Sequence, residues 1–136
     1  MKRKFFIMIA VLLSVLCSCH SNPGAADSYN SKNSLNWPGV YSCTFQTTDG
    51  IDLLLRLKLN RDQSYELTDI YPNRTYPPFT WTGSFSWDDT GNIITFIIAD
   101  APSHYRVTKN KLVMLDNEKN EINDKLSHNY DFIKVR

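Results

Sequence analysis

The sequence predicts an all-β protein, a small antiparallel barrel of about eight short strands joined in a meander. The clearest evidence is the stretch from Ile51 to Leu59, where apolar residues occupy every second position and charged residues take most of the others. A period of two places one face of a strand in a core and the other in water, whereas a helix would spread these charges around its circumference. The apolar face consists of Ile51, Leu53, Leu55, Leu57 and Leu59. In addition, no stretch after the N-terminal leader keeps a helical period over three turns.

Seven further segments share strand-like alternation or a short apolar run, and these are residues 37–45, 64–71, 79–87, 93–98, 104–108, 112–115 and 130–135. Clusters of Gly, Pro, Asn and Asp lie between most of them, as is typical of turns. Pro72–Pro78 predicts an irregular loop, and Asp100–Pro102 predicts the end of the preceding strand. The strands together are sufficient for one β-barrel domain, which we place at residues 37–136.

The first 18 residues predict an export signal. A basic start, Met1–Lys4, precedes an apolar run that is too short for a permanent membrane span. The run ends in Leu16-Cys17-Ser18-Cys19, which resembles a bacterial lipobox, where a cysteine is acylated and becomes the mature N-terminus. Cys19 follows a small residue and has leucine three positions upstream, whereas Cys17 follows a bulky one. We therefore predict lipidation of Cys19 and anchoring to a membrane through the lipid, with an ordinary cleaved signal as the alternative.

Residues 19–36 are rich in Ser, Asn, Gly and Ala, which predicts a flexible tether between the lipid and the barrel. Without the three basic residues of the leader, 12 Lys and Arg face 14 Asp and Glu, a net charge of −2. The basic residues are scattered, so the composition gives no support to nucleic-acid binding. His20 follows Cys19 where an aspartate would resemble an inner-membrane retention signal, and this favours the outer membrane of the cell envelope.

Six short motifs occur here in the same order as in NlpE-like lipoproteins, and the resemblance covers residues 37–136. The motifs are Trp37-Pro-Gly39-Val-Tyr41, Asp49-Gly50-Ile51, Asp62-Gln-Ser-Tyr65-Glu-Leu67, Trp81-Thr-Gly83-Ser-Phe85, His104-Tyr105-Arg-Val107 and Leu112-Val-Met-Leu115-Asp116. The chain resembles the NlpE N-terminal domain family, which implies a lipocalin-like barrel on the envelope. The resemblance also implies a non-enzymatic role in sensing envelope, surface-contact or copper stress through a protein partner.

The family usually carries a Cys-x-x-Cys pair before the Gly-Ile dipeptide, and it is linked to copper. In this chain those two places hold Phe45 and Thr48, and Cys43 lies two residues earlier on the predicted strand. Cys43 has the parity of Tyr41 and Phe45, which indicates a buried core residue rather than a ligand. No paired-thiolate site carries over, and we predict no cofactor.

Other candidate site residues have simpler interpretations. His104, Met114 and His128 are further weak candidates for a metal site together with Cys43, but their spacing matches no known site. Asp88 and Asp89 lie in a predicted turn, and no catalytic arrangement is recognisable. The aromatic residues Trp81, Phe85 and Trp87 could fill the barrel or line its mouth.

Two alternative functions remain open from the sequence. The barrel could be a periplasmic inhibitor of the lysozyme-inhibitor kind, which a protruding loop at Pro72–Pro78 would favour. It could also carry a small apolar ligand, which an internal cavity would favour. A filled barrel with a flat aromatic or acidic patch would favour the stress sensor.

Overall fold

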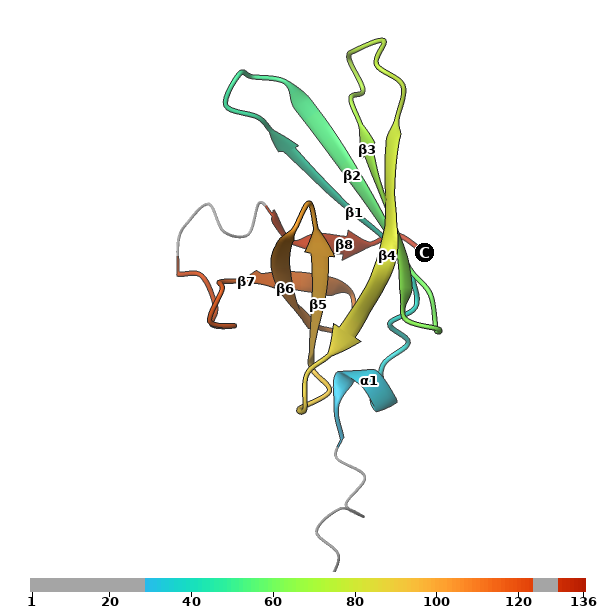
Figure 1. Cartoon of the computed structure of the whole chain (residues 1–136), viewed down its shortest axis with the longest axis vertical. Coiled ribbons are helices and arrows are strands. Elements are labelled where there is room, and N and C mark those ends of the chain that lie inside the picture. The colour runs from blue at the N-terminus through green and yellow to red at the C-terminus, as the bar shows by residue number, and fades with distance from the viewer. Residues whose placement is uncertain (1–28, 124–129) are drawn as a thin grey trace, which may run out of the picture.

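The computed structural model describes residues 29–123 and 130–136, and within them the chain forms a closed antiparallel barrel (Figure 1). Its elements are α1 (Ser31–Ser34), β1 (Gly39–Gln46), β2 (Asp52–Leu59), β3 (Ser64–Ile70), β4 (Phe79–Trp87), β5 (Ile93–Ile98), β6 (Ala101–Val107), β7 (Lys111–Leu115) and β8 (Phe132–Lys134). Each strand pairs with the next along the chain, and β8 closes the barrel by pairing with β1. The predicted all-β meander barrel is confirmed. The predicted leader, Cys19 and His128 lie outside the described residues.

The register follows the alternation of the sequence. Tyr41 of β1 lies opposite Leu57 of β2, and Leu57 lies opposite Leu67 of β3, so these side chains share the inner face. Leu57 and Leu59 are each 2% exposed, but Leu55 is only half-buried. The predicted parity of Ile51–Leu59 is therefore correct, while burial fades toward the start of β2, where the strand extends beyond the barrel.

Aromatic rings fill much of the interior. Phe96 is 1% exposed and makes ring contacts with Tyr65, Phe85 and Tyr105 at centroid distances of 5.0, 5.6 and 5.9 Å. Tyr105 in turn contacts Phe132 at 5.6 Å, which links β5 through β6 to β8. Edge-on arrangements dominate, as the quadrupoles of aromatic rings favour. The barrel core is thus packed with side chains.

The turn between β5 and β6 differs from the prediction. We expected a break at Asp100–Pro102 and a strand from His104, but β6 begins at Ala101. Ala99 and Asp100 have φ of 51° and 63°, the left-handed conformation that a two-residue hairpin turn requires. Pro102 pairs with Ile97 next to the hydrogen-bonded pair that closes the hairpin, so its nitrogen faces away from β5. On the other side β7 pairs with β6 only from His104 onward, so the missing N–H costs no ladder hydrogen bond.

The predicted tether ends earlier than residue 36, because its last residues are bound to the barrel. The Ser31 backbone N–H donates to Asn92 Oδ1 at 2.9 Å, and the Ser31 hydroxyl donates to Val107 O at 2.7 Å. The Lys32 N–H donates to Gly91 O at 2.9 Å. Composition did not reveal this, since the contacts are made by the backbone and a hydroxyl rather than by apolar side chains. No helix within residues 29–123 and 130–136 has the length and apolar character needed to cross a membrane.

Candidate functional site

Beyond the barrel, the far halves of β1–β4 continue as a four-stranded sheet, which we call the extension. It comprises residues 44–46, 52–54, 68–70 and 79–84. Figure 1 shows it rising past the tip of the β5–β6 hairpin, at the end of the molecule opposite α1. The cause lies in the pairing: β4 pairs with β3 from Phe79 to Ser84, but with β5 only from Phe85 to Trp87.

The extension exposes aromatic side chains that have the parity of the core. Phe79 and Trp81 are 56% and 36% exposed, and their rings meet at a centroid distance of 4.9 Å. Phe85, four residues after Trp81 on the same face of β4, is buried, and half-buried Trp87 packs against Trp37. Of the three aromatic residues that we expected to fill or line the barrel, Trp81 therefore lies outside it. Paired, exposed aromatic rings of this kind are typical of protein contact surfaces.

The predicted core role of Cys43 agrees with its surroundings. Cys43 is 5% exposed, and burial, with a smaller contribution from the charge of Asp131, raises the pKa of its thiol. Asp131 is itself buried, accepts a hydrogen bond from the Met114 N–H at 3.1 Å and lies 3.7 Å from Lys111 Nζ. This environment disfavours the thiolate, the form that binds metal or attacks substrates. Sequence reasoning missed Asp131, because nothing in its local pattern distinguishes it from a surface aspartate.

Of the other metal candidates, Met114 and His104 lie within the described residues. Met114 lies opposite Tyr105 and packs against the core, whereas His104 is one residue out of phase and hydrogen-bonds Thr95 Oγ1 through Nδ1 at 2.7 Å. Among the residues that the structure describes, no group of three or more His, Cys, Asp and Glu side chains is placed to hold a metal ion. Phe45 and Thr48 stand where the resembling family places its thiolates, so the residues present do not fit a paired-thiolate copper site.

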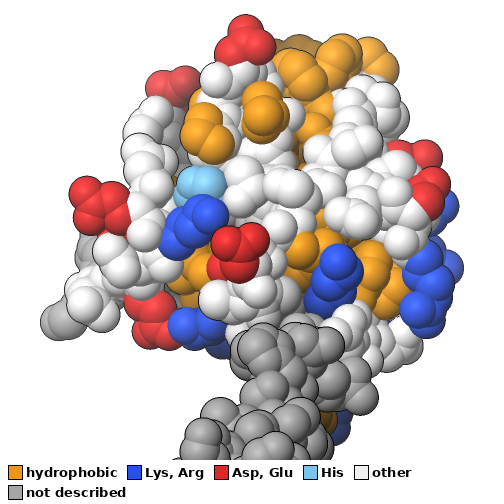
Figure 2. All heavy atoms as spheres, turned by 60° about the horizontal axis from the view of Figure 1, so that its bottom comes forward, with side chains coloured by type: hydrophobic (Ala, Val, Ile, Leu, Met, Phe, Trp, Pro, Cys, Tyr) orange, Lys and Arg blue, Asp and Glu red, His pale blue; other side chains and the backbone are white. Residues whose placement is uncertain are grey.

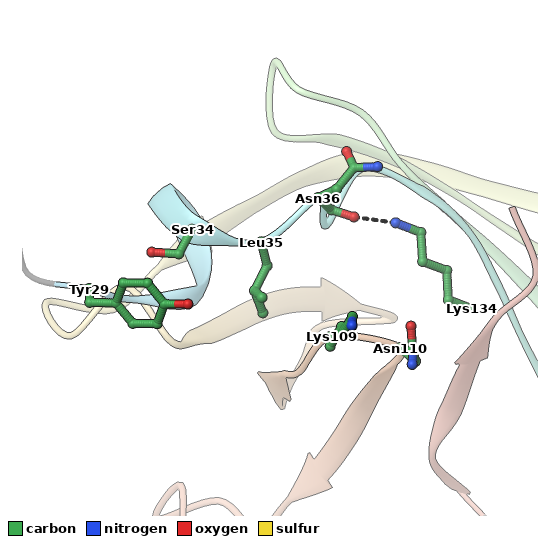
Figure 3. A pocket seen from close by; sticks show the side chains of 7 residues that line it. All are labelled: Tyr29, Ser34, Leu35, Asn36, Lys109, Asn110 and Lys134. Atoms are coloured by element: carbon green, nitrogen blue, oxygen red, sulfur yellow. Dashed lines mark hydrogen bonds between the residues drawn. The ribbon is translucent and has the colours of Figure 1, made fainter.

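A hollow of about 470 Å³ lies at the α1 end, where residues 29–36 meet the barrel (Figure 3). It is lined by Tyr29, Ser34, Leu35, Asn36, Lys109, Asn110 and Lys134. Lys134 Nζ donates to Asn36 O and lies 5.7 Å from the centre of the Tyr41 ring, and burial lowers the pKa of Lys134. Lys134, one of the two lysines that line the hollow, thus binds the N-terminal segment to the barrel.

Charged side chains of both signs are interspersed on the face that Figure 2 shows, with no field of a single sign. The pale blue side chain there is His104, the one histidine among residues 29–123 and 130–136. Asp88 of the predicted turn accepts hydrogen bonds from the Thr90 hydroxyl at 2.8 Å and the Ile93 N–H at 3.2 Å. Asp88 therefore stabilises the turn between β4 and β5.

These features define a small antiparallel barrel with a packed interior and an exposed aromatic extension. Comparison with known proteins identifies the family. The model of the NlpE N-terminal domain matches residues 41–125, and the chain belongs to this family, as an NlpE-like envelope lipoprotein.

Two solved structures are similar to the chain. A Shewanella oneidensis protein described as a lipoprotein is 36% identical with a TM-score of 0.67, over 79% of this chain and 97% of that one. The Cpx pathway activator NlpE from Escherichia coli is 20% identical with a TM-score of 0.53, over 65% of this chain and 47% of that one. The match thus spans about half of the E. coli protein, and at this identity it shows the fold alone. No match was found among curated proteins.

Proposed function

We propose that the protein is a non-enzymatic stress sensor, anchored to the outer membrane through Cys19, that reports envelope, surface-contact or copper stress to a protein partner. The observation that carries this proposal is the NlpE N-terminal domain match over residues 41–125 in a chain whose leader ends in Leu16-Cys17-Ser18-Cys19. The structurally similar E. coli protein activates the Cpx pathway, and we propose a signalling role of that kind here.

The distribution of features along the barrel supports a role through a partner. Residues 30–36, which follow the proposed anchor, contact the turns at one end, and the start of β4 lies at the other (Figure 1). This part of β4 carries the exposed rings of Phe79 and Trp81. The fully buried side chains include Tyr41, Ile94, Phe96 and Leu112, and a packed core favours a sensor over a carrier of an apolar ligand. A sensor tethered at one end would present the other end to its partner.

The anchor gives a first prediction. Replacement of Cys19 by alanine is expected to abolish labelling with a palmitate analogue and to leave the protein as precursor or in the soluble fraction, because the acyl chains provide the membrane affinity. Cys17→Ala is the matched control and is expected to keep full labelling. Labelling that persists in Cys19→Ala and disappears in Cys17→Ala would move the anchor to Cys17.

Signalling is tested separately in an envelope-stress reporter strain that lacks its own NlpE. Production of the full-length protein is expected to raise reporter output several-fold, with Asp88→Asn, a turn variant, as an expression-matched control of similar output. Unchanged output from a correctly lipidated protein would contradict the sensor role while leaving the lipoprotein assignment intact.

The loop between β3 and β4 favours a second candidate function. Its residues Pro72–Pro78 are exposed and protrude from the extension, with Tyr76 57% exposed at a ring distance of 5.7 Å from Tyr71 (Figure 1). A protruding loop of this kind suits an inhibitor that inserts it into the active site of a lysozyme. Inhibition of lysozyme that is lost in Tyr76→Ala would favour this candidate over the sensor.

A further inference from the structure

The feature that carries a further inference is the outer edge of β4 in the extension. From Phe79 to Ser84 the strand has β3 on one side, and among the described residues no strand pairs with it on the other. All six residues are exposed. The barrel therefore closes only along the lower part of β4, and the upper part remains a sheet edge.

The direction of the free backbone groups follows from the ladder. In antiparallel pairing, alternate residues direct their N–H and C=O groups to the same neighbour. The Asp88 N–H donates to Ile93 O on the β5 side, and the Phe85 N–H donates to Gln63 O on the β3 side. By the same parity, Thr80, Thr82 and Ser84 direct their N–H and C=O groups toward the free edge.

This edge lacks the devices by which proteins usually protect sheet edges. Charged side chains, prolines and bulges discourage pairing with another chain. The edge has the sequence Phe79-Thr-Trp-Thr-Gly-Ser84, which contains no charged residue and no proline. Pro77 and Pro78 lie just before it. An unprotected edge of this length is suited to accepting an extended segment.

The β4–β5 ladder ends at Phe85, beside a contact made by Tyr65. The Tyr65 ring lies against Gly83, where a Cβ atom would come within 2.9 Å of the ring, and the Tyr65 hydroxyl donates to Ile97 O of β5 at 3.2 Å. Continuation of the β4–β5 register would place Ile97 opposite Ser84. Its carbonyl is instead occupied by Tyr65, and β5 ends one residue later at Ile98, where the turn to β6 begins, so Phe79–Thr82 have no β5 residue to pair with.

The geometry disfavours a second copy of this chain as the occupant. Two β4 edges that pair antiparallel would be related by a two-fold axis, which reverses the direction of the second molecule. Its α1, and with it the proposed lipid anchor, would point away from the membrane that holds the first. A strand of a different protein has no such constraint.

The charge around the edge indicates the chemistry of the partner. The loops and strand ends on this side carry Asp49, Asp52, Asp69 and Asp100. Asp69 lies directly opposite Phe79, whereas Asp49 and Asp52 lie at the β1–β2 turn, on the far side of β3 from the edge. The same loops contain one cation, Arg74. Cationic flanks on an incoming strand would therefore be attracted at this end.

We propose that the free edge of β4 binds an extended segment of a partner protein, with apolar side chains at alternate positions facing Phe79 and Trp81 and with Lys or Arg at its ends. This inference deepens the partner-mediated function proposed above and rests on it for the identity of the partner as an envelope protein. The strand-accepting property itself is measurable on the purified chain.

The test uses the full-length protein in detergent micelles and the capped heptapeptide Lys-Val-Thr-Val-Thr-Val-Lys as probe. Fluorescence anisotropy is expected to give a dissociation constant below ~1 mM. Such weak affinity is what a few backbone hydrogen bonds would provide. Amide hydrogen exchange is expected to slow at Thr80, Thr82 and Ser84 on binding, and to be slow already at Trp81 and Gly83, which face β3. A peptide N-methylated at alternate residues, and one with glutamate at both ends, are expected to bind at least tenfold more weakly.

A matched pair of variants separates the edge from general stability. Thr82→Pro removes an outward N–H of β4 and is expected to weaken peptide binding at least tenfold. Thr44→Pro makes the same change at an exposed threonine of β1, whose parity also directs its N–H away from β2, and is expected to leave binding unchanged.

Each contrary result overturns the proposal. These are absence of binding at ~1 mM, equal binding of the N-methylated peptide, and equal loss in both proline variants. A dimer in sedimentation that disappears in Thr82→Pro would assign the edge to a second copy instead. None of these outcomes affects lipid labelling or reporter output, so failure here is distinguishable from failure of the proposed function.

Discussion

Replacement of Leu57 by aspartate is expected to unfold the barrel. Leu57 is 2% exposed, at the centre of the β1–β2–β3 ladder, opposite Tyr41 and Leu67. The change loses the burial of a leucine, about 2 kcal/mol or more, and adds the cost of an unpaired buried carboxylate, which is several kcal/mol. Domains of this size have a total stability of roughly 5–15 kcal/mol, so one such change removes most or all of it.

Arg56→Asp is the matched control for this variant. Arg56 is the next residue of β2 and is exposed on the opposite face, so the same side chain is introduced into water. Its free energy of unfolding is expected to change by less than ~1 kcal/mol. Chemical denaturation followed by tryptophan fluorescence measures both variants. Equal midpoints for Leu57→Asp and Arg56→Asp would contradict the inward assignment of Leu57.

The second large effect concerns alkaline pH. Burial raises the pKa of Tyr41 to about 12, and burial together with the nearby Cys43 and Asp131 raises the pKa of Tyr105 to about 12. The unfolded value is about 10, so the folded state binds these two protons more tightly than the unfolded state does. The resulting stability is complete below pH ~10 and is lost as the pH rises toward ~12. At ~1.4 kcal/mol per pH unit, each tyrosine accounts for about 3 kcal/mol of the loss.

Urea denaturation between pH 8 and pH 12 checks this expectation. The variant with both Tyr41→Phe and Tyr105→Phe is expected to lose much less stability over this range than the parent chain. Tyr41→Phe also removes the 2.6 Å hydrogen bond from its hydroxyl to Trp37 O, so about 1 kcal/mol of stability is lost at pH 8. Tyr76→Phe, at an exposed position, is the control. A double variant that follows the parent curve up to pH 12 would contradict the buried tyrosines as the cause.

The alternation of apolar residues was enough to predict the barrel, because a period of two needs only local information. It did not predict where the barrel ends. Trp81 and Phe85 have the same parity, but Phe85 is buried and Trp81 is exposed, and the difference depends on whether β5 continues alongside β4. That pairing is set by the turn after Ile98 that ends β5, and nothing in the sequence of β4 itself indicates where this turn falls along β4.

The free edge and the bound N-terminal segment were missed for a related reason. In the sequence Ser31 resembles any other linker residue. Its hydrogen bonds to Asn92 and Val107 exist only in the folded chain. The uncharged composition of residues 79–84 was visible in the sequence, but it signals an edge only once β4 is known to lack a second neighbour there. Polar contacts and unpaired strands are properties of the assembled sheet, whereas core parity is a property of each strand alone.

The attachment of residues 30–36 to the barrel also shortens the stretch of chain between the barrel and the proposed lipid anchor. A free linker from the proposed anchor at Cys19 to Trp37 would reach about 60 Å when fully extended. The Asn30 side chain lies against Gly91 in the turn between β4 and β5, so ten residues lie between the proposed anchor and the barrel, and the 11 Cα–Cα steps span at most about 38 Å. With the proposed anchor at Cys19, the extension lies within this reach plus the length of the molecule, because it is at the end opposite α1. The proposed partner segment must come within that distance of the same bilayer.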